Sequence, residues 1–226
     1  MSKLWEAPPS RERPVLSVPV IARAAIELAD QEGIDALSMQ RVAAVLGFTK
    51  MALYRHVSDK AELLAVMVDV AVGEPPSLGA GDWRTRLESF LAALSAVWER
   101  HPWLPWVTLG DRMMGPREMA WVECALTALD DTGLSGVEKM DAVTLLFGHI
   151  RNTQSSGTAG TQPWAEDHQV REPYKELLER HGDRFPALSA TLAGIGEAPG
   201  DFGRRFGLDC ILDGLAVRIG RAASGA

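Results

Sequence analysis

The sequence has few cysteines and no long apolar run. Cys124 and Cys210 are the two cysteines of 226 residues, too few for a disulfide framework and not arranged as CxxC, which is typical of a reducing compartment. The N-terminus lacks the apolar core of a signal peptide, and no stretch approaches the roughly 18 apolar residues of a membrane span. We therefore expect a cytoplasmic protein with no membrane partner.

Patterns of catalysis and metal binding are also missing. The chain has no HExxH, no GxSxG and no phosphate-binding glycine loop, and its five histidines show no metal-ligand spacing. Glu166, Asp167 and His168 are consecutive, so their side chains point in different directions, and an acidic surface turn is favoured over a metal site. The sequence predicts neither an enzyme nor a bound metal or cofactor.

Charge is distributed unevenly along a chain of globular composition. The sequence carries 23 Lys+Arg and 30 Asp+Glu, for a net charge of −7, with 46% hydrophobic residues. Residues 1–60 hold 8 basic and 7 acidic residues, a net of +1, and the other 166 residues hold 15 and 23, a net of −8. The first quarter could approach a polyanion that the acidic remainder would repel.

The N-terminal segment begins with an irregular arm and continues with helical patterns. Residues 1–16 contain three prolines and mixed charges without a period, which predicts a mobile arm. Apolar residues then recur at helical spacing until Gly33, where a helix would end in a left-handed residue. Ser38 is a good N-cap for a short helix over Met39–Leu46, and Gly47 ends that helix.

Two further helices are predicted directly after this glycine. Thr49 can cap a third helix from Lys50 to about His56. Asp59 can cap a fourth, with Glu62 reaching back as in a capping box, and this helix continues to Gly73. The second and third helices are thus joined by a few residues around a glycine, which is the pattern of a helix-turn-helix.

The second and third helices have the residues that such a unit needs. Ala43 permits a close helix crossing, Gly47 gives the turn its backbone freedom, and Leu53 and Val57 point inward. A generic helical hairpin without a ligand is the alternative, since helix–glycine–helix alone is common. The outer side, which would enter a DNA groove about 12 Å wide, carries Lys50, Met51, Ala52, Tyr54 and Arg55.

Residues 18–73 resemble the DNA-binding domain of the TetR family of transcriptional regulators. The resemblance is carried by EGIDALSM at the end of the first helix, RVAAVLGF in the second, ALYRHV in the third and DKAELL at the start of the fourth. Lys50 departs from the family pattern, in which many relatives have proline. This adds a cation at the recognition helix and affects base preference rather than fold.

The resemblance implies DNA contacts from the second and third helices and the start of the fourth. Glutamine can pair with adenine and lysine with guanine, and Met51 or Ala52 could touch a thymine methyl group. Tyr54, His56 and Lys60 would hold phosphates, although Tyr54 could instead be a core tyrosine, and His56 and Lys60 solvated surface residues. The implied contacts are Gln40, Thr49, Lys50, Met51, Ala52, Tyr54, His56 and Lys60.

The rest of the chain is also read as helical, because no strand alternation appears. A Pro/Gly-rich joint over 74–82 precedes a helix capped by Asp82, and Ser135 with Glu138 opens a long helix. Residues 152–165 read as a loop whose first half could extend that helix. Further helices are expected over 117–129, 171–181, 186–194 and 201–222, with a short one in the connector after His101. The fold class is all-α: a helix-turn-helix domain over 17–73 and a larger effector-binding and dimerisation domain over 74–226.

The family resemblance implies a homodimer, because one small helix-turn-helix domain contacts few base pairs. The two DNA-binding domains of such a dimer lie about 34–36 Å apart, so that they reach successive major grooves. The helices 137–151 and 201–222 are the expected dimer surface, where Gly207, Gly214, Ala216 and Gly220 would permit close approach. Ordinary intramolecular core is the alternative.

An effector pocket is expected in the C-terminal domain, as an apolar cavity with a few polar groups. Five of the seven tryptophans lie in residues 83–121. Taken singly, most such aromatic and methionine residues would be core, and His149 would more often be a satisfied core histidine. The expected lining is Trp103, Trp106, Met113, Met114, Trp121, Phe147, His149 and Asn152.

Together these features predict a ligand-responsive transcriptional regulator. The favoured form is a homodimeric repressor on a palindromic operator, released by a small molecule that moves the fourth helix. The alternatives are an activator, a ligand-independent regulator, or a helical carrier or enzyme whose N-terminal module has lost DNA binding.

Overall fold

The computed structural model describes residues 15–109, 112–159, 172–193 and 204–224, and in these residues every regular element is a helix. The all-α prediction is confirmed. The expected arm up to residue 14, the triplet 166–168 and residues 160–165 of the expected loop lie outside the described residues. None of the described helices combines the length and hydropathy that crossing a membrane requires.

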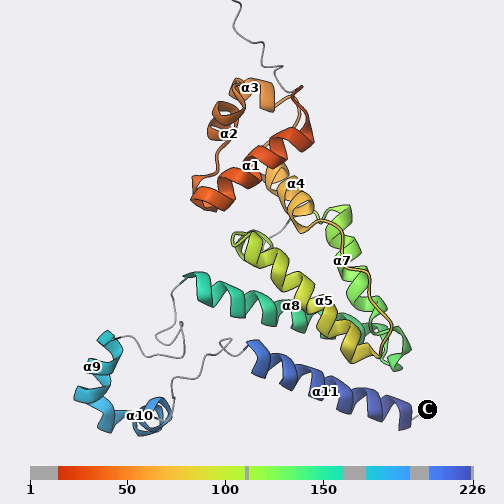
Figure 1. The fold of residues 1–226 in the computed structure, drawn as a ribbon, viewed down its shortest axis with the longest axis vertical. Coiled ribbons are helices and arrows are strands. Elements are labelled where there is room, and N and C mark those ends of the chain that lie inside the picture. Colours follow the sequence, from red (N-terminus) through yellow and green to blue (C-terminus); the bar gives the residue numbers. More distant parts are fainter. Residues whose placement is uncertain (1–14, 110–111, 160–171, 194–203, 225–226) are drawn as a thin grey trace, which may run out of the picture.

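Four helices make up the N-terminal part, at one end of the molecule (Figure 1). They are α1 (Val18–Glu32), α2 (Met39–Leu46), α3 (Lys50–Leu53) and α4 (Lys60–Val72), with a 3₁₀ turn, η2 (Ile34–Ala36), after α1. The predicted caps are present: Ser38, Thr49 and Asp59 each accept a hydrogen bond from the backbone N–H three residues on. Gly47 is left-handed at φ 72°, which lets Phe48 N donate to Ala43 O at 2.9 Å.

Two details of this part differ from the sequence prediction. The third helix ends at Leu53 rather than near His56, and residues 54–56 form a turn. Glu62 does reach back, but its carboxylate accepts hydrogen bonds from the backbone and hydroxyl of Ser58, one residue before the cap. These bonds hold the pKa of Glu62 below its ordinary value.

The larger C-terminal part contains a long helix, α8, against which α5, α6, α7 and α11 pack. Its elements are α5 (Trp83–Arg100), α6 (Leu104–Val107), α7 (Pro116–Thr127), η3 (Asp130–Thr132), α8 (Gly136–Ala159), α9 (Glu172–His181), η4 (Gly182–Arg184), α10 (Pro186–Ala193) and α11 (Arg204–Ser224). The alternative left open for residues 152–165 is confirmed in its first half, because α8 continues to Ala159 and extends the preceding helix. Small and polar residues do not interrupt a helix that is already hydrogen-bonded along its length. The expected final helix starts at 204, and residues 201–203 are not described.

Buried apolar side chains form one continuous core through both parts. Ile21, Leu53 and Leu63 are fully buried in the N-terminal helices, as is Leu87 in α5. Phe90 lies at the centre of the C-terminal part, with its ring edge-to-face against Trp121 and Phe147 at 5.5 and 5.8 Å. Helix α4 packs on both α1 and α7, so it joins the two parts.

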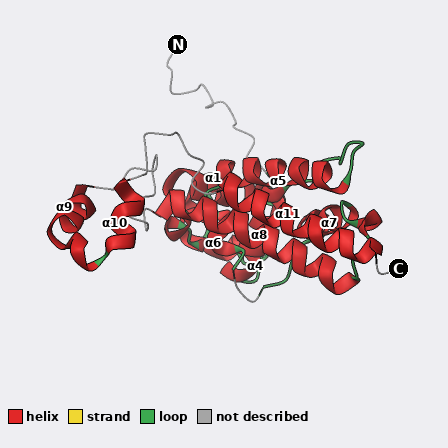
Figure 2. Ribbon diagram, turned by 90° about the horizontal axis from the view of Figure 1, so that it is seen from below, coloured by secondary structure: helices red, strands yellow, loops and turns green. Residues whose placement is uncertain are grey.

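Helices α9 and α10 stand away from this body. They are joined by η4 and extend to one side in both views (Figures 1 and 2). Helix α11 instead lies along the end of the molecule opposite α3, next to α8. The DNA-facing and dimer-facing elements expected from the sequence are therefore at opposite ends.

Candidate nucleic-acid interface and ligand cavity

The predicted DNA contacts lie on the outer side of α2, α3 and the start of α4. The opposite side of these helices packs into the core: Leu53 and Val57 are at most 1% exposed, and Val42 and Ala43 are also buried. The predicted residues themselves are exposed or half-buried: Gln40, Thr49, Lys50, Met51, Ala52, Tyr54, His56 and Lys60. The fold therefore brings all of them to accessible positions around one short helix.

Within this group, Lys50 and Tyr54 are in direct contact. The Lys50 ammonium lies 5.4 Å from the centre of the Tyr54 ring, a cation–π distance. Tyr54 is half-buried, so its ring packs on the core while one side remains accessible. The Tyr54 ring thus supports the cation of Lys50, and both groups lie on the accessible side of α3.

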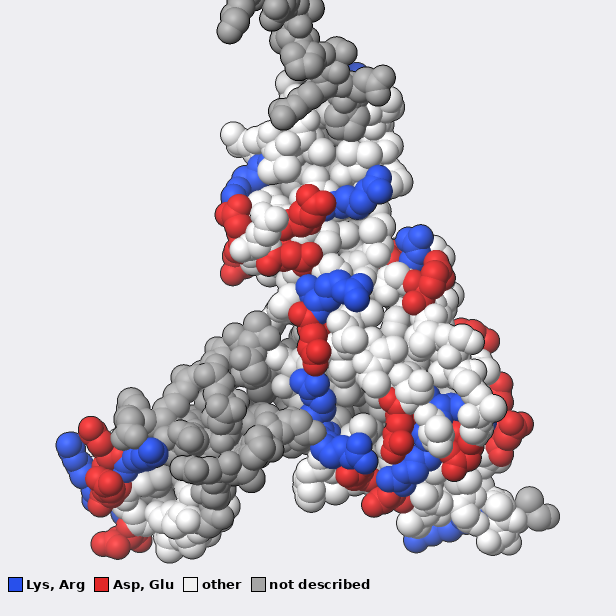
Figure 3. Space-filling view, in the orientation of Figure 1, with Lys and Arg blue, Asp and Glu red and all other residues white. Residues whose placement is uncertain are grey.

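The start of α4 is a less favourable anion site than its helix dipole suggests. Asp59 and Glu62 place two carboxylates there, and both are already bonded within the turn. Attraction of a phosphate at this point must therefore come mainly from the side chain of Lys60, which is exposed. On the face shown in Figure 3, basic and acidic side chains are interspersed over the helices rather than gathered by sign.

Arg41, on the same helix as Gln40, is held within the chain. Its guanidinium binds the Glu32 carboxylate at 2.6 and 2.7 Å and the Ala36 carbonyl at 3.3 Å. This pair connects α2 to the end of α1 and orients the helix from which Gln40 projects. The charge of Arg41 is thus compensated by a structural contact.

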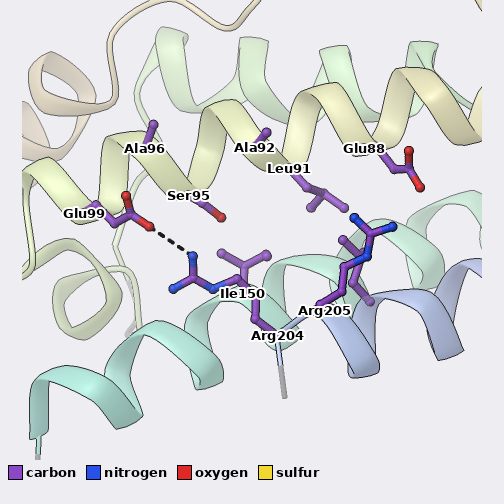
Figure 4. A pocket seen from close by; sticks show the side chains of 10 residues that line it. Glu88, Leu91, Ala92, Ser95, Ala96, Glu99, Ile150, Arg204 and Arg205 are labelled. Carbon is purple, nitrogen blue, oxygen red and sulfur yellow. Dashed lines mark hydrogen bonds and ion pairs between the residues drawn. The ribbon is translucent and has the colours of Figure 1, made fainter. Parts of the chain in front are cut away.

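The described C-terminal part has three cavities, of which the smallest, of about 200 Å³, lies between α8 and α11 and holds none of the predicted pocket residues. The first, of about 330 Å³, is between α5, α8 and α11, and Figure 4 shows its lining. Its Arg204 is paired with Glu99 at 3.0 Å, and its Arg205 is paired with Asp209 at 3.2 Å. This space is bordered by ion pairs and holds none of the residues predicted to line a pocket.

The second cavity, of about 360 Å³, is formed by α6, α7 and α8. It is lined by Thr108, Arg112, Met114, Glu118, Val122, Met140, Val143, Thr144, Phe147 and Arg151. Its volume falls at the lower end of the roughly 300–1,000 Å³ of small-molecule sites, and its lining is mainly apolar with a few charged groups. Met114 and Phe147 are the predicted pocket residues found here.

The other residues predicted for the pocket are placed elsewhere. Met113 is 84% exposed, Trp106 is 45% exposed on α6, and Asn152 is exposed on α8. His149 donates from Nε2 to the Arg204 carbonyl at 2.8 Å, and a Cβ atom on Gly207 would overlap its ring. His149 and Gly207 thus pack α8 against α11 within one chain, so the close approach at Gly207 is intramolecular.

Trp103 and Trp121 contact the N-terminal part instead of the cavity. Trp103 donates from Nε1 to Asp30 of α1 at 2.6 Å, and the same carboxylate lies 2.9 Å from His101 Nδ1. Trp121 donates to the carbonyl of Gly73, at the end of α4, at 3.0 Å. Both indoles are only 3% exposed. They connect the two parts of the protein, which their clustering in the sequence did not reveal.

A hydrogen-bond chain joins the second cavity to α4. Arg112 and Glu118 form a buried two-bond ion pair at 2.5 and 2.6 Å in the cavity wall. Glu118 lies in the first turn of α7, where Asp69 of α4 accepts a hydrogen bond from Arg117 N at 2.7 Å. Gly115 has no side chain with which to cap α7, and a Cβ there would overlap the Asp69 carboxyl group. Helix α4 therefore supplies the cap of the helix that carries Glu118.

Sequence reasoning missed Asp69, Arg112, Glu118 and Arg151. The one available signal was local: Pro116 at the first position of a helix and Glu118 at the third mark a helix start. Asp69 is 46 positions before Gly115, and only the packing of α4 on α7 reveals the contact. Among the residues that the structure describes, no group of three or more potential ligands could hold a metal ion.

A helix-turn-helix at one end and a cavity in the C-terminal part, joined to α4 by hydrogen bonds, are the arrangement of a DNA-binding regulator. Family comparison agrees: residues 21–67 match the model of bacterial regulatory proteins of the tetR family, and residues 75–219 match the tetracyclin repressor-like C-terminal domain. The chain belongs to the TetR family, whose members are DNA-binding transcriptional regulators and not enzymes.

Individual relatives support the same assignment. The chain is 34% identical to the HTH-type transcriptional repressor DrrR1 of Streptomyces coeruleorubidus, over 96% of this chain and 84% of that one. It is 26% identical to the class A tetracycline repressor protein from transposon 1721 of Escherichia coli, over 88% and 89%. The crystal structure of the Streptomyces coelicolor TetR family protein ActR in complex with actinorhodin superposes with a TM-score of 0.70 at 27% identity, over 90% and 96% of the two chains.

Proposed function

We propose that this protein is a homodimeric repressor that binds a palindromic operator and is released when a small molecule fills the cavity between α6, α7 and α8. The observation that carries this proposal is the link from Arg112 and Glu118 in the cavity wall, through the start of α7, to Asp69 of α4. The repressor DrrR1 and the ligand-bound ActR are relatives with the corresponding properties in their names.

The proposed release works through a difference in affinity. A ligand that contacts Arg112 or Glu118 prefers one position of the α7 start, and α4 follows because its Asp69 caps that start. Helix α4 also packs on α1, so its movement changes the spacing of the two recognition helices on DNA. Such coupling is typically about 1–3 kcal/mol, or about 5–150-fold in affinity.

The function is tested by selecting DNA from a random duplex pool with the purified protein. We expect a palindromic sequence, bound with an affinity that falls steeply as salt rises because phosphate contacts release counterions. A compound library is then screened for release of that operator. Failure to enrich any sequence would indicate that the N-terminal module does not bind DNA. Activation of transcription in an in vitro assay would exclude a repressor function.

Dimerisation is proposed to use α8 and α11. Helix α11 presents exposed positions at helical spacing, with Phe206 at 76% and Val217 at 55% exposure, and Leu145 of α8 is 54% exposed. Cys210 and Gly214 lie between them on the same face of α11. An apolar stripe on adjacent helices is suited to a two-fold interface, in which the same patch meets itself.

Changing Val217 to glutamate should convert the dimer into a monomer and abolish operator binding. In a two-fold interface the substitution brings two unpaired carboxylates into an apolar contact, which costs several kcal/mol. Sedimentation equilibrium measures the result against the monomer mass of 24.5 kDa. The matched control is Met119→Glu on α7, 62% exposed in the chain, which should leave the dimer intact. A dimeric Val217→Glu would place the interface elsewhere.

A further inference from the structure

The second cavity contains one cation whose charge is not balanced. Arg112 is neutralised by Glu118, and its Nε also donates to the Val107 carbonyl at 3.1 Å. Within the described part of the chain, no carboxylate pairs with Arg151, and its buried Nε has no hydrogen-bond partner. The ionised groups that line the cavity therefore sum to a net charge of +1.

Arg151 is held in place by packing rather than by an ion pair. Its guanidinium carbon lies 5.8 Å from the ring centre of Trp98, which is 3% exposed, so the cation is within cation–π distance of a buried indole. Burial lowers the pKa of Arg151, because removal from water disfavours its charged form. An arginine nevertheless remains protonated in proteins, so the cost of its burial is left uncompensated until an anion arrives.

Most of the remaining lining is apolar and suits the body of such an anion. Met114 and Met140 are flexible and polarisable, Phe147 presents a ring, and Val122 and Val143 complete the wall. The lining also holds two threonines: Thr108, whose hydroxyl donates to the Leu104 carbonyl at 3.0 Å, and Thr144. Arg151 is thus the charged donor of this wall that no carboxylate neutralises.

We infer that the effector of this cavity is a compact organic anion, with an apolar, ring-containing body against Phe147 and the methionines and an acidic group bound by Arg151. A guanidinium recognises carboxylate and related oxyanions through paired N–H donors. This inference rests on the proposed function for its biological meaning, but the preference for anions is a property of the cavity alone and is tested without DNA.

The test uses two fluorescent probes with the same ring system. The full-length protein is titrated with the anion 1-anilinonaphthalene-8-sulfonate and with neutral N-phenyl-1-naphthylamine, which lacks the sulfonate. We expect Arg151→Gln to weaken binding of the sulfonate about 10-fold or more, in line with the value of a charge-assisted hydrogen bond. Binding of the neutral probe should change less than about 3-fold, and Arg151→Lys should recover part of the affinity for the sulfonate.

Arg204→Gln is the matched control, because Arg204 lines the first cavity and is paired with Glu99. It should leave both titrations unchanged. Equal affinity for the sulfonate in wild type and Arg151→Gln, a parallel loss of both probes, or a response to Arg204 instead would each overturn the inference. If Arg151 governs anion binding but no anion releases the operator, then the cavity assignment stands and the proposed function fails.

Discussion

Replacing Tyr54 with phenylalanine should weaken operator binding about 100-fold while leaving the fold and the dimer unchanged. A hydrogen bond to a charged group contributes about 1.5 kcal/mol or more, and a dimer makes it twice, which gives about 3 kcal/mol. The ring stays in place in Tyr54→Phe, so its packing on the core and its contact with Lys50 are retained. Fluorescence anisotropy with the selected operator measures the loss.

Two further variants separate the hydroxyl from the ring. Tyr54→Ala should abolish detectable operator binding, because Lys50 also loses its support. Circular dichroism and sedimentation should show that this variant is folded and dimeric, because Leu53 and Val57 remain buried in the core when the Tyr54 ring is removed. Operator affinity of Tyr54→Phe within about 2-fold of wild type would show that the tyrosine is a core residue without a phosphate contact, which is the alternative left open by the sequence.

Replacing Asp69 with alanine should separate effector binding from operator release. The variant removes the α4 side chain that caps α7 but leaves the cavity lining and the DNA-facing residues unchanged. Loss of an N-cap costs about 1 kcal/mol of stability, which a folded dimer can tolerate. In the absence of the other ligand, effector and operator should each bind with an affinity within about 5-fold of the wild-type value. The change in operator affinity caused by the effector should fall from the 5–150-fold range to about 2-fold or less.

Glu74→Ala is the control for Asp69→Ala. Glu74 binds the Arg117 side chain at 2.9 Å but is 75% exposed, so its removal disturbs the same arginine without removing the cap. The effector should release the operator from this variant as from wild type, because an exposed ion pair contributes about 0–1 kcal/mol. Wild-type release from Asp69→Ala would mean that the signal reaches α4 by another route, such as Trp121 and Gly73.

The helix-turn-helix was predictable in detail because local rules specify it. Ser38, Thr49 and Asp59 cap helices that follow within one turn, and Gly47 adopts the left-handed conformation that its position required. The end of the third helix was placed too late, because helix ends are the least specified part of a helical pattern, and residues 54–56 form a turn after Leu53. The end of α8 at Ala159, inside the stretch 152–165, was likewise left open by the sequence.

The sequence by itself determined the fold class and the helix starts, and the residues that it predicts for DNA contact lie at accessible positions. These follow from contacts between residues three or four apart, which a linear pattern records directly. The tertiary structure decided which tryptophans join the two parts, which arginine of the cavity is unbalanced and which carboxylate caps α7. Those properties depend on groups far apart in the chain, such as Asp30 with Trp103 and Asp69 with Arg117, whose proximity is created only when the helices pack.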